Sequence, residues 1–202
     1  MVDPQGQTSV DETVERFHAT SGKIPGVIAI GVAAVVIVFS VVERDRGFPL
    51  PIVLGAVAFG ILAWAALIRP RVWATREHLV MRNMLHTAWV PLAAIEQVAV
   101  RQVLAVSAGD RRFVSPAIGR TLRQTVKNNR AVKPERAIES YPVFVEERIL
   151  QLADDARTQH GVRRFSEEQA ALAVGARKAW AWPEIAGLVV FLGGAVVTML
   201  VR

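Results

Sequence analysis

Three long runs of the sequence carry no charged residue, and this feature limits the possible folds more than any other. They extend over Ile24 to Val42, Phe48 to Ile68 and Ile185 to Val201. At 1.5 Å per residue, the first run gives a helix of roughly 28 Å, close to the hydrocarbon thickness of a bilayer. A soluble core of this size seldom needs uncharged helices of such length. We therefore predict three transmembrane helices, the first two forming a hairpin.

A cleaved signal peptide is the main alternative for the first run. A signal peptide begins with a basic region, whereas residues 1–23 contain Asp3, Asp11, Glu12 and Glu15 and only two basic residues. The apolar run is also longer than the core of a signal peptide. The composition agrees with retained spans, because 52% of the residues are hydrophobic and only 21% are charged.

The distribution of Lys and Arg predicts the orientation of the spans. Two of these residues lie at the hairpin tip, nineteen lie in residues 69–182, and only Arg202 follows the third span. Segments rich in Lys and Arg stay on the cytoplasmic side. We therefore expect a multi-pass protein of the cell membrane, with a cytoplasmic N-terminus and central segment and with its C-terminus outside.

These observations divide the chain into five parts. We predict a cytoplasmic N-terminal segment, a transmembrane hairpin, a cytoplasmic domain, a helical connector and a C-terminal transmembrane helix, over residues 1–23, 24–68, 69–160, 161–184 and 185–201.

The first part of the central segment has the pattern of short antiparallel strands. Apolar and polar residues alternate imperfectly, and Ala108-Gly109-Asp110 supplies a hairpin turn. Leu79 and Met81 share one face of a strand, and Val80 and Arg82 share the other. The expected strands are Val72–Thr75, His78–Asn83, Thr87–Val90, Ile95–Gln102, Leu104–Ser107 and Arg112–Ser115. The pattern predicts an α+β membrane protein with a small curved sheet or barrel, followed by an amphipathic helix over residues 142–157.

Arg69 to Val100 resembles the start of the bacterial pleckstrin-homology-like (PH-like) domains of small actinobacterial membrane proteins. The resemblance is carried by the Arg69-Pro70 pair after a span, by Arg82-Asn83 at a strand end, and by Pro91 and Ile95. A second transmembrane element after the domain also fits that family. The resemblance implies a PH-like sheet or barrel with a C-terminal helix, and it implies a binding surface without specifying its ligand.

A basic stripe follows the strands. Arg120, Arg123, Lys127 and Arg130 are spaced 3, 4 and 3 residues apart, which places them on one face of a helix. Three interpretations stay open for this face: contact with a membrane surface, contact with nucleic acid, and a solvated helix or loop. Nucleic-acid binding favours interleaved aromatic residues, and residues 117–140 contain none. The stripe is thus a candidate for contact with anionic lipid.

The sequence shows no catalytic constellation. Its four histidines are scattered without metal-binding spacing, and it contains no cysteine. The adjacent acids, such as Glu146-Glu147, point about 100° apart on a helix and are not preset as a catalytic pair. Phosphate-binding and dinucleotide-binding motifs are absent. We therefore expect no enzyme activity, no metal site and no cofactor.

Small residues in the spans are candidates for close helix packing. Ala56 and Gly60 form a small-xxx-small pair on the second span. Gly193 and Gly194 lack side chains and so reduce the width of the third span. Because Gly and Ala are common in spans, ordinary packing within the chain is the simpler use for them.

The sequence predicts a non-enzymatic integral membrane protein whose PH-like domain is a protein-interaction or assembly module. Two alternatives stay open: an accessory subunit of a larger membrane complex, possibly respiratory, and a regulator that senses anionic lipid. The expected partners are membrane lipids and a protein in the membrane or at its cytoplasmic face, and no nucleic acid.

Overall fold

The computed structural model describes residues 13–20, 22–43, 49–119 and 141–201. The described residues belong to two compact units, each treated separately below. We call them the sheet unit and the three-helix unit. The sheet unit takes the described parts of Met1–Ser21, Arg71–Asn83 and Thr87–Ala179, and the three-helix unit those of Gly22–Pro70, Met84–His86 and Trp180–Arg202.

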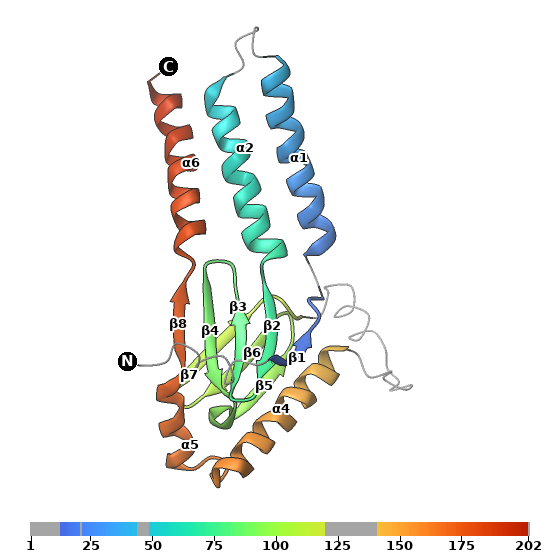
Figure 1. Ribbon diagram of the computed structural model, residues 1–202, viewed down its shortest axis with the longest axis vertical. Coiled ribbons are helices and arrows are strands. Elements are labelled where there is room, and N and C mark those ends of the chain that lie inside the picture. Colours follow the sequence, from blue (N-terminus) through green and yellow to red (C-terminus); the bar gives the residue numbers. More distant parts are fainter. Residues whose placement is uncertain (1–12, 21, 44–48, 120–140, 202) are drawn as a thin grey trace, which may run out of the picture. The chain divides into compact units, whose positions relative to one another are not determined.

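The three-helix unit contains the predicted spans. They are α1 (Lys23–Val42), α2 (Leu50–Ala63) with its π-helical continuation η2 (Trp64–Ile68), and α6 (Trp182–Leu200). All three are long and apolar enough to cross a membrane. Helix α2 lies between the other two (Figure 1). The three predicted helices are present, although α6 begins before Ile185 and includes Glu184 in its first turn.

The larger sheet of the sheet unit has five strands in the order β1-β2-β3-β4-β8. Three of them form a meander that follows the second span: β2 (Arg71–Thr75), β3 (His78–Arg82) and β4 (His86–Pro91). Their alternation places Val72, Leu79 and Met81 in the core, and the opposite face carries Val80 and Arg82. The predicted strands and facing are confirmed here.

The smaller sheet contains β5 (Gln97–Val100), β6 (Leu104–Ala108) and β7 (Arg111–Ser115). Gly109 has a φ of 53° in the turn between β6 and β7, which favours glycine at the predicted turn. Val98 and Val100 face the core. The two sheets are separate, so the described strands do not form a closed barrel.

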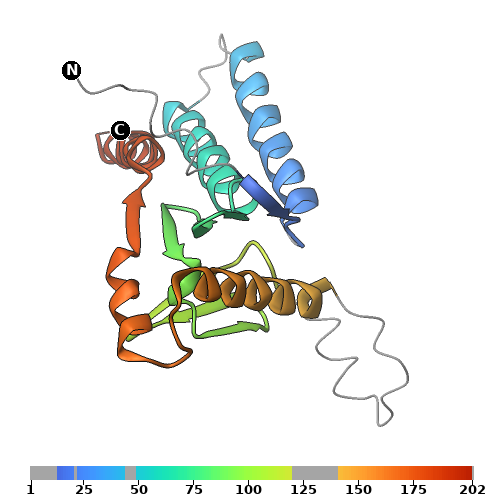
Figure 2. The ribbon, with the colours of Figure 1, turned by 60° about the horizontal axis from the view of Figure 1, so that its bottom comes forward.

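Helix α4 (Tyr141–His160) covers the second sheet. Its residues Val145, Ile149 and Ala153 are fully buried in the core that both sheets share. The helix packs against β5 and against the 3-10 turn η3 (Leu92–Ala94) that joins the two sheets (Figure 2). The predicted helix over residues 142–157 is confirmed.

Residues 161–184, predicted as a helical connector, also contain a strand. Ser166 Oγ accepts a hydrogen bond of 3.2 Å from the Gln169 N–H and thereby caps the start of a helix. The resulting helix α5 (Glu167–Leu172) does not continue toward Trp180. It gives way to η4 (Ala173–Gly175) and then to β8 (Arg177–Trp180), an edge strand that pairs with the meander.

Like β8, strand β1 in the N-terminal segment was not predicted from the sequence. Strand β1 (Thr13–Phe17) precedes α1 in the chain, yet it pairs with β2. An ion pair of 2.7 Å between Glu15 and Arg148 joins it to α4. The His18 N–H donates to the Tyr141 hydroxyl, and burial raises the pKa of Tyr141 despite that bond. Residues 13–20 of the N-terminal segment are therefore part of the sheet unit.

Candidate functional site

The three-helix unit has an apolar groove of about 610 Å³ between α1, α2 and α6. Small residues from all three helices line the groove, so a molecule bound in it can lie close to the helix backbones. They are Ala33, Ala34, Ala56, Gly60 and Gly187. Trp64 and Glu184 line the same groove at the end where η2 and α6 begin. The groove is thus apolar along the helices and bears a carboxylate at one end.

That carboxylate belongs to a buried ion pair. Arg69 Nε lies 3.0 Å from Glu184 Oε1, and the two side chains are only 6% and 13% exposed. Arg69 ends the π-helical turn, and Glu184 lies in the first turn of α6. A cation at a helix C-terminus and an anion at an N-terminus are both favoured by the helix dipoles. The pair therefore joins the ends of the second and third spans at positions where each charge is stabilised.

The tip of the β3–β4 hairpin belongs to the same cluster. Arg69 Nη1 donates a 2.6 Å hydrogen bond to the Met84 carbonyl oxygen. The Ala181 N–H donates to the Leu85 carbonyl at 2.8 Å, and the rings of His86 and Trp180 meet edge to face. Arg69 thus binds a backbone oxygen as well as a carboxylate, which holds its guanidinium in one orientation.

Two glycines bring α1 against η2 at this end of the unit. Gly22 has a φ of 100°, and a Cβ built there would lie 2.5 Å from the Leu67 carbonyl oxygen. A Cβ on Gly26 would lie 2.8 Å from Ile68 Cγ1. Because a side chain would clash at both positions, glycine is required for this contact.

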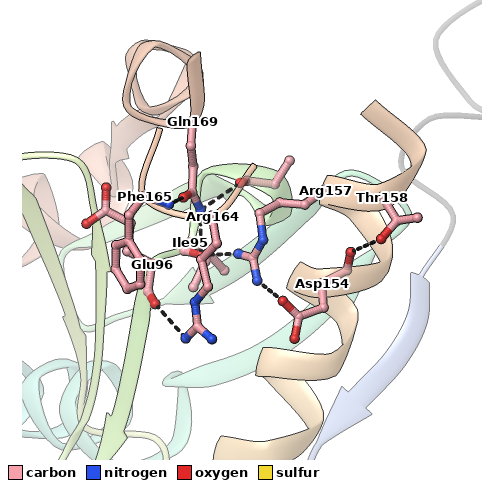
Figure 3. A network of polar contacts seen from close by, with 9 residues as sticks. Ile95, Glu96, Asp154, Arg157, Thr158, Arg164, Phe165 and Gln169 are labelled. Atoms are coloured by element: carbon pink, nitrogen blue, oxygen red, sulfur yellow. Dashed lines mark hydrogen bonds and ion pairs between the residues drawn. The ribbon is translucent and has the colours of Figure 1, made fainter. Parts of the chain in front are cut away.

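The sheet unit has its own buried polar cluster, which connects α4, η3 and α5 (Figure 3). Arg157 donates a 2.6 Å hydrogen bond to the Ile95 carbonyl and pairs with Asp154 on its own helix. Gln169 donates to the Ala93 and Ile95 carbonyls at 3.2 and 3.1 Å, and its side-chain oxygen accepts from the Phe165 N–H at 2.6 Å. Burial lowers the pKa of Arg157, and the cation of Arg164 adds to this effect. The bonds satisfy backbone groups, so this cluster fixes the fold.

Within the described ranges, no group of three or more His, Asp or Glu side chains lies close enough together to hold a metal ion. The polar groups of the three-helix unit are bonded to one another instead, as the Arg69 contacts show. The chemistry that the site offers is therefore binding: an apolar groove with small-residue walls and a fixed ion pair at its end.

The predicted packing residues occupy different surroundings. Ala56 and Gly60 line the groove, and a Cβ on Gly60 would lie 3.5 Å from the Ala33 Cβ. A Cβ on Gly194 would lie 3.4 Å from Leu54 Cδ1, whereas one on Gly193 would meet no atom within 4 Å. The predicted lipid-contact residues Arg120, Arg123, Lys127 and Arg130 lie outside the described residues.

Sequence analysis missed two features of this site. The Arg69–Glu184 pair joins residues that are far apart in the chain, so no local pattern relates them. The contact through Gly22 and Gly26 has a signal, since these residues form a glycine pair at the spacing typical of close helix packing. Gly22 precedes the uncharged run that begins at Ile24, so the pair is not visible within that run.

Comparison with protein-family models, with curated proteins and with solved structures gives no match for this chain.

Proposed function

We propose that the chain is a non-enzymatic integral membrane protein that acts as an assembly module, with a PH-like domain on the cytoplasmic side. The groove of the three-helix unit carries this proposal. Lipid chains adapt to any apolar surface, whereas alanine and glycine, which supply five of the twelve lining residues, favour close contact with another helix. The occupant we propose is a transmembrane helix of a partner protein.

The dimensions of the groove fit such a helix. Its lining residues extend from Ile30 to Ile37 on α1 and from Ala56 to Trp64 on α2. At 1.5 Å per residue, each stretch is about 10–12 Å long, or two helical turns. Two turns with small residues on both sides provide a specific packing site. The Arg69–Glu184 pair holds α6 beside α2 and thereby keeps the groove in shape.

The topology of the strands supports the proposed placement of the domain. Strand β1 precedes the α1–α2 hairpin and β2 follows it, yet the two strands pair in one sheet. Two crossings return the chain to the side where it began, as this pairing requires. The excess of Lys and Arg in residues 69–182 is the reason to assign that side to the cytoplasm.

The order of elements supports the PH-like assignment. Four strands in one antiparallel sheet are followed by three in a second sheet and then by α4, which packs on the shared core. Two features would distinguish this domain from other PH-like domains. They are the transmembrane hairpin inserted between β1 and β2, and the additional edge strand β8.

Site-specific photo-crosslinking in the native membrane tests the groove. A photoreactive side chain at Ala34, which is exposed and lines the groove, should capture a discrete membrane protein. The same group at Ala186, an exposed alanine of α6 outside the lining, should not capture it. Equal capture from both positions would contradict the proposal.

Substitution of the same two alanines separates assembly through the spans from assembly through the domain. Ala34→Leu fills part of the groove and should release the captured partner during purification in mild detergent, whereas Ala186→Leu should retain it. A partner retained by both variants is bound elsewhere, which would favour the sheet unit as the binding module. A partner lost only with Ala34→Leu is held mainly by the spans, as the proposed occupant of the groove requires.

Reporter fusions test the orientation. A reporter active only outside the cytoplasm should be silent after Gln97 and active after Arg202. The reverse pattern would refute the cytoplasmic placement of the domain.

A further inference from the structure

The face of the five-stranded sheet that points away from the core is basic and aromatic. One row across it consists of Arg16, Trp73, Val80 and Trp89, which are successive cross-strand partners; Val80, between the two tryptophans, is buried. Arg177 of β8 continues this row, with its guanidinium 4.9 Å from the centre of the Trp89 ring. A second row pairs Arg71 with Arg82 and Arg82 with Thr87. We call these two rows the outer face.

The arginines of the outer face lack carboxylate partners. Among the residues that the structure describes, none of these four guanidinium groups is in an ion pair. The five strands contain a single acid, Glu15, and it pairs with Arg148 of α4. Arg71 and Arg82 are direct cross-strand partners, and like charges so placed destabilise a sheet. An anion bound between them would offset this repulsion.

Chain continuity keeps Arg71 of the outer face close to the end of the second span. Arg71 is the third residue after Ile68, where the second span ends, so the two residues are at most about 10 Å apart. Its partner Arg82 is held beside it by the sheet. On the other side, β8 leads directly into α6 through Trp180 and Trp182, which are 52% and 69% exposed. Exposed tryptophans at the end of a span are typical of the headgroup region.

We propose that the outer face binds the phosphate groups of anionic lipids, in the leaflet at which the second span ends. Arginine suits this ligand because its planar guanidinium binds phosphate oxygens through two hydrogen bonds. Trp73 and Trp89 are half-buried and offer amphipathic rings to the interfacial region. This inference uses residues of the sheet unit only and does not depend on the groove of the three-helix unit.

Single-site labelling of the full chain in nanodiscs tests the proposal. Because the sequence contains no cysteine, Thr87→Cys creates a unique site for a fluorescent label beside Arg82. The nanodiscs contain phosphatidylcholine alone or with phosphatidylglycerol, plus a trace of lipid with a quencher on its headgroup. Quenching should be stronger in the anionic discs. It should weaken between 0.15 M and 1 M salt, as the screening length falls from about 8 Å to 3 Å.

Two pairs of substitutions identify the residues responsible. Arg71→Gln with Arg82→Gln should lower the ratio of docked to undocked label on the order of thirtyfold, at about fivefold per arginine. Arg101→Gln with Arg112→Gln removes the same charge from exposed positions outside the outer face and should leave the quenching nearly unchanged. If thermal unfolding shows that the first variant does not fold, Arg16→Gln with Arg177→Gln replaces it.

The proposal is overturned by equal quenching in neutral and anionic discs, which would leave an acidic protein surface as the ligand to consider. It is also overturned if both substitution pairs reduce quenching equally, because the effect would then reflect net charge rather than this face.

Discussion

Among the described residues, each unit contains one buried arginine, and the two are held in different ways. Arg69 of the three-helix unit and Arg157 of the sheet unit are 7% and 4% exposed. Each donates a 2.6 Å hydrogen bond to a backbone carbonyl. The carboxylates differ: Glu184 is 13% exposed and belongs to another helix, whereas Asp154 is 58% exposed and lies one turn away on the same helix.

The different exposure of the two carboxylates indicates which ion pair contributes more to the stability of the fold. Removal of one partner from a buried pair leaves an uncompensated charge, which costs several kcal/mol. Removal of an exposed partner costs little, because water replaces it. The Arg69–Glu184 pair therefore joins two helices, whereas Asp154 contributes little to the fixing of Arg157.

Glu184→Ala should have the largest effect. It leaves the Arg69 guanidinium buried with the Met84 carbonyl as its remaining partner in this cluster, and we expect a loss of about 3–5 kcal/mol in the free energy of unfolding. Thermal unfolding of the full chain in mild detergent measures this loss. A variant as stable as the parent would show that water reaches the pair.

Gln169→Leu should have an intermediate effect. The Ile95 carbonyl keeps its bond from Arg157, but the Ala93 carbonyl and the Phe165 N–H lose their Gln169 partner. Buried polar groups that lose a hydrogen-bond partner lower the free energy of unfolding by about 1–3 kcal/mol. The same unfolding measurement applies, with Gln151→Leu on the exposed side of α4 as a control. Equal stabilities of the two variants would argue against a structural role for the cluster.

Asp154→Ala should have the smallest effect, below about 1 kcal/mol, because the carboxylate is exposed and pairs within one helix. Arg157 keeps its bond to the Ile95 carbonyl in this variant. A loss as large as that of Glu184→Ala would remove the distinction between the two arginines.

Sequence analysis predicted the elements whose signal is local. Uncharged length identified the three spans, and alternation identified β2 to β7, since each pattern is set by the element's own contact with lipid or core. It missed β1 and β8. Both are edge strands with exposed or partly exposed residues over most of their length, so burial leaves little alternation in them.

The site could be predicted only in part. The small residues Ala56 and Gly60 were recognised because their spacing on one helix is visible in the sequence. Their neighbours in the groove come from α1 and α6, and a single sequence does not pair residues on different helices. Glu184 was left outside the third span, since a charge marks the limit of an uncharged run, although the helix begins at Trp182.

The central claim is that the Arg69–Glu184 pair holds the second and third spans together at the end of the groove. A double-mutant cycle tests it most directly, with unfolding of the parent, Arg69→Met, Glu184→Met and the double variant, beside the matching cycle for Arg157 and Asp154. We predict a coupling energy of about 2–3 kcal/mol for the first cycle, with much of the stability recovered in the double variant, and about 0.5 kcal/mol or less for the second. Additive effects of Arg69→Met and Glu184→Met would contradict the account.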